Sequence, residues 1–186
     1  MTFIRGKRTG KLWADVQTII NIVDDTNCNI GHKSERELES HLYGCIDSHK
    51  TRLNKSFIFQ RNQNQTVNSA KFFGKSHRPD MTLDNDGLAI ELKFVNSSLD
   101  SARTAIGQGF IYRKEYKFVV LILVISKKHA DEFHSAYEDN IAKADKSNIF
   151  HKLADDNIFT VVKAGFAPKK GYGDTIVYPV ELKNRV

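Results

Sequence analysis

The sequence predicts an α/β protein with a mixed central sheet flanked by helices. Segments with apolar residues at helical spacing alternate with short apolar runs, which is the order expected when helices pack on one sheet. The longest apolar run, residues 118–125, suits a buried central strand and is too short to cross a bilayer. With 186 residues, the chain is expected to form a single domain, residues 1–186, with a substantial core.

The first part of the chain is expected to hold two helices. Apolar residues recur at helical spacing over residues 12–24, namely Trp13, Val16, Ile19, Ile20 and Val23. Ser34 is a plausible N-cap, with Glu37 completing a capping box, and it opens a helix that ends near His49. Residues 1–11, which precede both helices, form a basic arm without an acidic residue.

The rest of the chain alternates between strands and helices. Further strands are expected at residues 56–60, 78–83, 88–95, 117–126, 157–164 and 175–180. Further helices are expected at residues 97–116, 128–140 and 148–154, the first of them capped by Ser97 or Ser98. Residues 61–69 are interpreted as a polar loop, and residues 157–186 form a C-terminal strand extension.

Composition narrows the class of protein. A net charge of +6 favours an acidic partner such as nucleic acid, although basic proteins of other kinds are common. The two cysteines, Cys28 and Cys45, form no paired or zinc-type motif, so a reduced, cytoplasmic setting is expected. The N-terminus lacks the apolar run of a signal peptide. Phosphate-binding, dinucleotide-binding and α/β-hydrolase motifs are missing, so no nucleotide cofactor is expected.

The strongest chemical pattern lies in residues 77–95. Side chains alternate across a strand, so Glu91 and Lys93 share one face while the apolar residues between them take the other. A turn through residues 84–87 can return the chain so that Asp80 lies beside them. Two carboxylates suit a hard divalent cation, and a neighbouring lysine can steady a water or a phosphate.

A structural interpretation of the same residues stays open. Asp80 could be a turn residue after Pro79, and Glu91 with Lys93 could be a charge pair on a solvated face. The strand that carries Glu91 is otherwise apolar, however, which favours a partly enclosed acidic face.

These motifs resemble the PD-(D/E)xK nuclease superfamily, which has the restriction-endonuclease-like fold. The resemblance implies that Asp80 and Glu91 hold Mg²⁺, with Mn²⁺ able to replace it, and that Lys93 orients the attacking water. Gln108 and Tyr112 resemble the additional Q-x-x-x-Y motif of RecB-type members. There the glutamine positions water or metal and the tyrosine contacts nucleic acid. Without the resemblance, Gln108 would be a surface glutamine and Tyr112 an aromatic at the core edge.

Many members of that superfamily supply a further acid from an upstream helix. Glu35, Glu37 and Glu39 compete for this role, and Glu39 is preferred because it lies near the apolar stripe. All three could instead be first-turn acids that interact with the helix dipole.

Several basic residues are candidates for contacting nucleic acid, or else are ordinary solvated side chains. They are Arg78, Arg103, Lys169 and Lys170. His77 could touch a phosphate, although a lone histidine is more often structural. A second acid-Leu-Lys triplet, Glu181 to Lys183 with Asp174 upstream, lacks a hairpin turn and a following helix. We therefore expect it to lie outside the site.

The resulting expectation is a Mg²⁺-dependent DNA endonuclease that acts as a homodimer and not at a membrane. A restriction, defence, phage or structure-selective nuclease would fit a chain of this size. The alternatives are a nucleic-acid-binding module that keeps the fold without cutting, and a structural α/β domain. Sequence specificity, DNA versus RNA, and endo- versus exonuclease action stay open.

Overall fold

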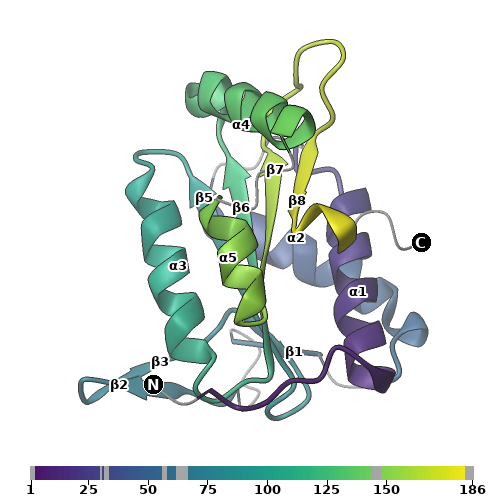
Figure 1. The fold of residues 1–186 in the computed structure, drawn as a ribbon, viewed down its shortest axis with the longest axis vertical. Helices are drawn as coiled ribbons and strands as arrows, with labels where there is room; N and C mark the ends of the chain where they lie inside the picture. The colour runs from purple at the N-terminus through teal and green to yellow at the C-terminus, as the bar shows by residue number, and fades with distance from the viewer. Residues whose placement is uncertain are drawn as a thin grey trace.

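A computed structural model describes residues 3–29, 31, 34–55, 58–61, 67–143 and 148–182. A mixed sheet of six strands lies at its centre, in the order β1-β4-β5-β6-β7-β8 (Figure 1). These strands are β1 (Ile58–Gln60), β4 (Met81–Leu83), β5 (Leu88–Val95), β6 (Phe118–Ile125), β7 (Ile158–Ala164) and β8 (Thr175–Tyr178). A separate hairpin pairs β2 (Ala70–Phe72) with β3 (Lys75–His77). The predicted α/β architecture with a mixed sheet is confirmed.

Helices cover both faces of the sheet. They are α1 (Gly10–Asp25), α2 (Glu35–Ser48), α3 (Asp100–Tyr112), α4 (Ala130–Lys143) and α5 (Ile149–Asp155). Short 3₁₀ helices span Lys50–Arg52, Lys127–His129 and Val180–Leu182. Helices α1 and α2 pack on one face, whereas α3, α4 and α5 pack on the other. None of the described helices is both long enough and apolar enough to cross a bilayer.

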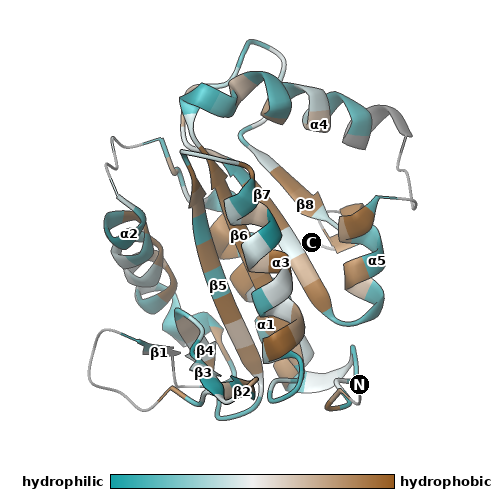
Figure 2. Ribbon diagram, turned by 90° about the vertical axis from the view of Figure 1, so that its left-hand side faces the viewer, coloured by the Kyte–Doolittle hydropathy of each residue, from teal (hydrophilic) through white to brown (hydrophobic). Residues whose placement is uncertain are grey.

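The middle of the sheet is parallel and its edges are antiparallel. Strands β5, β6 and β7 run in parallel, while β4 and β8 pair with them in the antiparallel sense. All eight residues of β6 are buried because helices lie over both of its faces, and this accounts for its continuous apolar run. Figure 2 shows the hydrophobic residues gathered along the central strands, while α2 is hydrophilic on its outward side.

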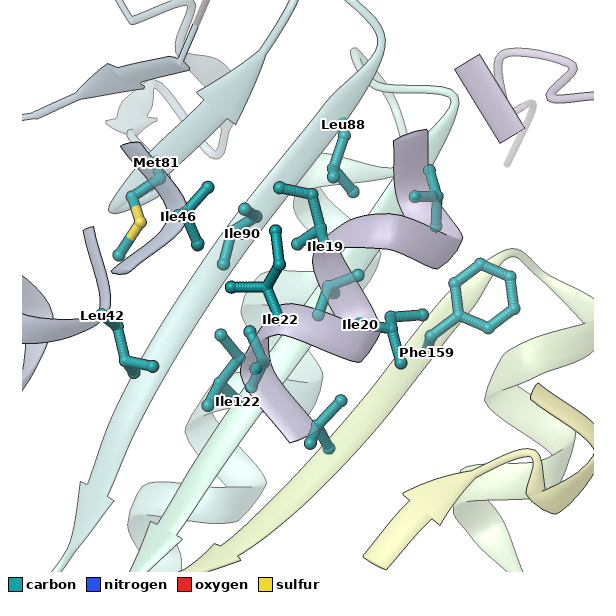
Figure 3. Close-up of a cluster of buried hydrophobic side chains, with 14 of the residues drawn as sticks. Ile19, Ile20, Ile22, Leu42, Ile46, Met81, Leu88, Ile90, Ile122 and Phe159 are labelled. Carbon is teal, nitrogen blue, oxygen red and sulfur yellow. The ribbon is translucent and has the colours of Figure 1, made fainter. Parts of the chain in front are cut away.

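The larger core lies between the sheet and the first two helices. Ile19 and Ile22 of α1 point toward Leu88 and Ile90 of β5, as Figure 3 shows. Trp13 packs its ring 5.6 Å from that of Phe118 and 5.4 Å from that of Phe159, measured between ring centroids. Since these contacts join α1 to β6 and β7, the helix is fixed on the sheet by its apolar face.

A buried lysine holds the end of α1 against the far strands. Lys163 of β7 is fully buried, and its Nζ donates a 2.6 Å hydrogen bond to the carbonyl of Asp24. The same nitrogen lies 3.3 Å from a carboxylate oxygen of Asp174 and contacts the hydroxyl of Thr175. Asp24 belongs to the last turn of α1, where carbonyls lack helical partners, so the cation caps the helix.

Several predicted boundaries were wrong, among them the start of α3, whose N-cap is Leu99 rather than Ser97 or Ser98, and two have identifiable reasons. The strand predicted at residues 78–83 is only β4, because Pro79 has no N–H to donate to a ladder. The residues that precede Arg78 form β3, which pairs with β2 instead of extending β4. Helix α3 ends at Tyr112 rather than near residue 116, in a turn where the Arg113 guanidinium binds the carbonyls of Tyr116 and Asp156. The predicted N-cap of α2 is confirmed, since the Ser34 hydroxyl accepts from the Glu37 N–H.

Candidate active site

The candidate site lies where β4 begins, beside the middle of β5. Asp80 immediately precedes β4, and its N–H donates to the carbonyl of Ile90 across the hairpin. Its Oδ2 accepts a 2.9 Å hydrogen bond from the N–H of Leu92. The register pairs Met81 with Ile90, so Asp80 lies level with Glu91. The turn therefore brings the first carboxylate alongside the second, as the sequence predicted.

Glu91 and Lys93 lie together on the face of β5 opposite its apolar residues. Glu91 is fully buried, and its Oε1 lies 2.7 Å from the Nζ of Lys93. The same Nζ lies 3.3 Å from Oε1 of Glu35, which projects from the first turn of α2. Lys93 keeps 15% of its side chain exposed, so solvent reaches part of that side chain.

Helix α2 contributes two acids rather than one. Glu35 and Glu39 are four residues apart and so share a helical face. Glu35 accepts a 3.0 Å hydrogen bond from the N–H of Phe94, while the buried Glu39 lies 3.4 Å from the Gln60 amide. The sequence favoured Glu39 alone; Glu35 is the one that contacts Lys93.

Arg61 was missed by the sequence interpretation, which assigned it to a polar loop. Its guanidinium lies 2.6 Å from Oδ1 of Asp80 and 3.7 Å from Oε2 of Glu39, so it bridges the two acids. Its N–H donates to the carbonyl of Asp80 next to the short β1–β4 ladder. Only this strand pairing places Arg61 in the site, and no local sequence signal could have revealed it.

Tyr112 differs from its expected role. Its side chain is fully buried, so in this structure it is not available to contact nucleic acid. Its hydroxyl lies 3.0 Å from Oε2 of Glu91 and 3.0 Å from the carbonyl of Arg78. A hydroxyl has one hydrogen, so it can donate to only one of these acceptors, and both contacts are hydrogen bonds only when a protonated Glu91 donates to the hydroxyl oxygen. Tyr112 thus positions Glu91 from behind.

Gln108 lies one helical turn before Tyr112 on the same side of α3. Its Oε1 is buried and has no hydrogen-bond partner among the described residues. A buried amide oxygen without a partner is unfavourable, and such atoms are uncommon in folded proteins. Gln108 therefore offers an available polar atom on the helix face that carries Tyr112.

Burial and mutual repulsion raise the pKa values of the carboxyl groups in the site. Burial raises the pKa of Glu91 to about 7, and the neighbouring Asp80 charge adds to the effect. The pKa values of Asp80 and Glu39 are also raised, again chiefly by burial. Burial acts to lower the pKa of Lys93, but the neighbouring carboxylates, Glu91 foremost, together outweigh it, so this pKa is raised. Perturbed groups of this kind gather at functional sites more often than elsewhere.

The oxygen atoms present fit a hard divalent cation. Asp80 Oδ1 and Glu91 Oε1 are both buried and accept no hydrogen bond of normal geometry, although a basic side chain contacts each. Mg²⁺ prefers oxygen ligands and commonly uses one or two protein carboxylates together with waters and substrate phosphates. Within the described part of the chain, no group of three or more His, Cys, Asp or Glu forms a complete protein metal site. The two carboxylates instead fit a Mg²⁺ site in which waters and substrate phosphates supply the other ligands.

Comparison with protein-family models, curated proteins and solved structures finds no match. The chemistry of this site must therefore be inferred from its own residues.

A polar depression opens beside the carboxylates. It has a volume of about 460 Å³ and is lined by Glu35, Arg36, Glu39 and Arg61. The depression reaches solvent on the side of α2, so a charged ligand can approach Arg61 without disturbing the apolar core.

The remaining predicted residues lie outside this cluster. Arg78 has an exposed side chain, and Arg103 forms an exposed ion pair with Asp100 on α3. Lys169 and Lys170 lie in the loop between β7 and β8, where Lys169 is 3.6 Å from Asp131 of α4.

In the described residues, the second acid-Leu-Lys triplet does not form a site with its upstream acid, Asp174. Glu181 lies exposed in a 3₁₀ helix, and Asp174 pairs with Lys163 rather than with Glu181. Lys183 lies outside the described residues.

Proposed function

We propose that the chain is a metal-dependent deoxyribonuclease of the PD-(D/E)xK type, which hydrolyses phosphodiester bonds in DNA. The observation that carries the proposal is the grouping of Asp80, Glu91 and Lys93 at the start of β4 and the middle of β5, where each of two buried carboxylate oxygens contacts a basic side chain and has no other polar partner. The fold supports it, because a hairpin, a helix and a parallel strand follow one another in the order that the resemblance implies.

Asp80 and Glu91 would hold Mg²⁺, which when bound supplies an activated water and neutralises charge at the phosphate. Asp80 is fixed by the Leu92 N–H and Glu91 by the Tyr112 hydroxyl, so both carboxylates are held before substrate arrives. Lys93 lies between Glu91 and Glu35, where its ammonium group can orient a water or a phosphate oxygen. Gln108 contributes its buried amide oxygen as a further acceptor.

Arg61 has a second task in this proposal. It neutralises Asp80 and Glu39 in the metal-free protein, where their charges would otherwise repel one another. Its side chain is 38% exposed and borders the polar depression, so it can turn from the carboxylates toward a DNA phosphate. Guanidinium groups bind phosphates well because their donors match two oxygens at once.

A duplex has two strands, and a single site of this kind cuts one of them. Action as a homodimer is therefore part of the proposal, and sedimentation of the protein with and without DNA would test it.

The proposal is tested by incubating supercoiled, linear, single-stranded and branched DNA with the protein in Mg²⁺, Mn²⁺ or EDTA. Wild type is expected to cut in either metal and not in EDTA. Lys93→Ala and Asp80→Asn are expected to lose cutting while keeping the fold by circular dichroism. Lys152→Ala, which removes an exposed cation of α5, is the matched control and should cut normally. Cutting by Lys93→Ala at the wild-type rate would refute the assignment.

One observation favours a second candidate, a DNA-binding module that does not cut. Each of the two buried carboxylates already has a basic partner, Arg61 or Lys93, as in a structural ion-pair network. In that case calorimetry would detect no Mg²⁺ binding, while DNA binding would weaken steeply as salt rises.

A further inference from the structure

The β2–β3 hairpin carries two phenylalanines at its tip. Its strands are joined by Phe73 and Gly74 alone, and the hairpin projects beyond the lower end of α3 (Figure 1). Phe73 is 90% exposed and Phe72 is 38% exposed, with their ring centroids 4.4 Å apart in an edge-on contact. An apolar pair in this position contributes little to the core.

Phe73 also adopts a backbone conformation that its side chain disfavours. Its φ is +46° and that of Gly74 is +74°, so both turn residues lie in the left-handed region typical of type I′ hairpins. Asn, Asp and Gly are favoured there, and the other described non-glycine residues with positive φ are Asp84 and Asn157. Neither packing nor turn geometry accounts for a phenylalanine at this tip, which suggests that it serves a ligand.

The surroundings of the tip are basic. Residues 67–79 contain Lys71, Lys75 and Arg78 and no acidic residue. Lys71 and Lys75 are exposed and flank the phenylalanines on the two strands. Cations beside an exposed aromatic pair match nucleic acid, because the cations bind phosphates while the rings stack on bases.

The base of the hairpin is held firmly by the end of α3. The Tyr116 hydroxyl donates to the carbonyl of Asn68 at 2.7 Å, and Lys114 Nζ donates to the carbonyl of Lys71 at 3.0 Å. The Tyr112 hydroxyl lies at the same distance from the carbonyl of Arg78 as from Glu91. The tip is therefore braced against the helix that also supports the candidate metal ligand.

We propose that Phe73, supported by Phe72, inserts between neighbouring bases of DNA as a wedge, while Lys71 and Lys75 bind the flanking phosphates. The choice of DNA as the partner rests on the proposed function. Apolar side chains used in this way unstack base steps and kink the duplex. Unstacking costs less where stacking is already interrupted, so the expected substrates are branched, mismatched or nicked duplexes.

The chain limits how far the wedge can lie from the cut. Asp80 is seven positions after Phe73, and a fully extended chain of that length spans at most about 25 Å. With a rise of about 3.4 Å per base along a strand, the unstacked step should fall within about seven base steps of the cut phosphate.

The test compares Phe73→Asn with wild type on a linear duplex and a four-way branched DNA, in EDTA so that the DNA stays intact. Asparagine tolerates the left-handed conformation, so the hairpin should persist without the ring. The matched control is Leu99→Asn, which removes another exposed apolar side chain from the start of α3. Permanganate, which oxidises unstacked thymines, reports the distortion, and gel mobility reports affinity.

Wild type and Leu99→Asn are expected to make thymines reactive within that distance of the cut position. Phe73→Asn should lose this reactivity and bind branched DNA about 5- to 150-fold more weakly, the range measured for base–aromatic stacking. Unchanged reactivity and affinity in Phe73→Asn would overturn the wedge while leaving the nuclease standing. If wild type never cut DNA in Mg²⁺ but Phe73→Asn still lost thymine reactivity and affinity, the wedge would be retained and the nuclease rejected. Unreactive thymines with wild type on both DNAs, or self-association that requires Phe73 without DNA, would also overturn the wedge.

Discussion

Glu91→Gln should stabilise the metal-free protein at alkaline pH while abolishing cleavage. Burial raises the pKa of Glu91 from 4.5 to about 7, so the folded protein binds this proton more tightly than the unfolded chain. The stability that the group contributes is therefore complete below about pH 4.5 and is lost as the pH rises through 7. At pH 8 the ionised group costs on the order of 3 kcal/mol, since one pKa unit corresponds to about 1.4 kcal/mol.

Glutamine removes this cost because it is neutral at every pH and nearly the same size. Lys93 would lose one partner but keep Glu35 at 3.3 Å, so its charge stays paired. Urea unfolding followed by circular dichroism, in EDTA at pH 5 and pH 8, measures the free energy of unfolding. The free energy of unfolding of Glu91→Gln should exceed that of wild type, and the difference should be larger at pH 8 than at pH 5. Glu181→Gln, at an exposed acid, is the control and should match wild type at both pH values.

Magnesium gives the same experiment a second arm. Binding to the folded state stabilises a protein by an amount that grows with ligand concentration. Mg²⁺ should therefore stabilise wild type at pH 8 and leave Glu91→Gln nearly unchanged. If Glu91→Gln were equally or less stable than wild type in EDTA at pH 8, ionising the Glu91 carboxylate would not destabilise the folded protein. The reasoning from burial would then be wrong.

Three further outcomes follow from the contacts of individual side chains. Arg61→Gln should bind Mg²⁺ several-fold more tightly in the absence of DNA, because the guanidinium no longer competes for Asp80. Calorimetry measures this affinity, and weaker binding by the variant would contradict the prediction. Gln108→Met should leave the urea midpoint unchanged or raised, because an unpartnered buried oxygen is removed, while cleavage falls. Lys163→Met should lower the free energy of unfolding by about 2 kcal/mol, as for other hydrogen bonds to charged groups; an unchanged midpoint would show that the cap on Asp24 has little effect.

Local patterns were enough to predict most of the fold. The bounds of α1, α2, β5 and β6 were predicted to within two residues, because helical spacing and apolar runs are properties of neighbouring residues. The β2–β3 hairpin was missed, since its turn holds Phe73 where an Asn-Gly or Asp-Gly pair would have signalled it.

In the candidate site too, some residues could be predicted from local signals and others could not. Strand alternation and one turn bring Asp80, Glu91 and Lys93 together, and both signals are local. The positions of Arg61 and Glu35 depend on how β1 pairs with β4 and how α2 packs against β5. Such contacts join residues far apart in the chain, and no spacing within a single sequence encodes them.

The packing of Trp13 between Phe118 and Phe159 gives the molecule an internal optical probe. It is the one tryptophan of the chain, and its side chain is almost buried against the sheet. Its fluorescence should lie at short wavelength while α1 is docked and shift to the red when water reaches the indole. Because the indole contacts the core and none of the site carboxylates, a shift during a metal titration would report movement of α1 rather than occupancy. Every variant discussed above leaves Trp13 in place, so all can be compared by the same signal.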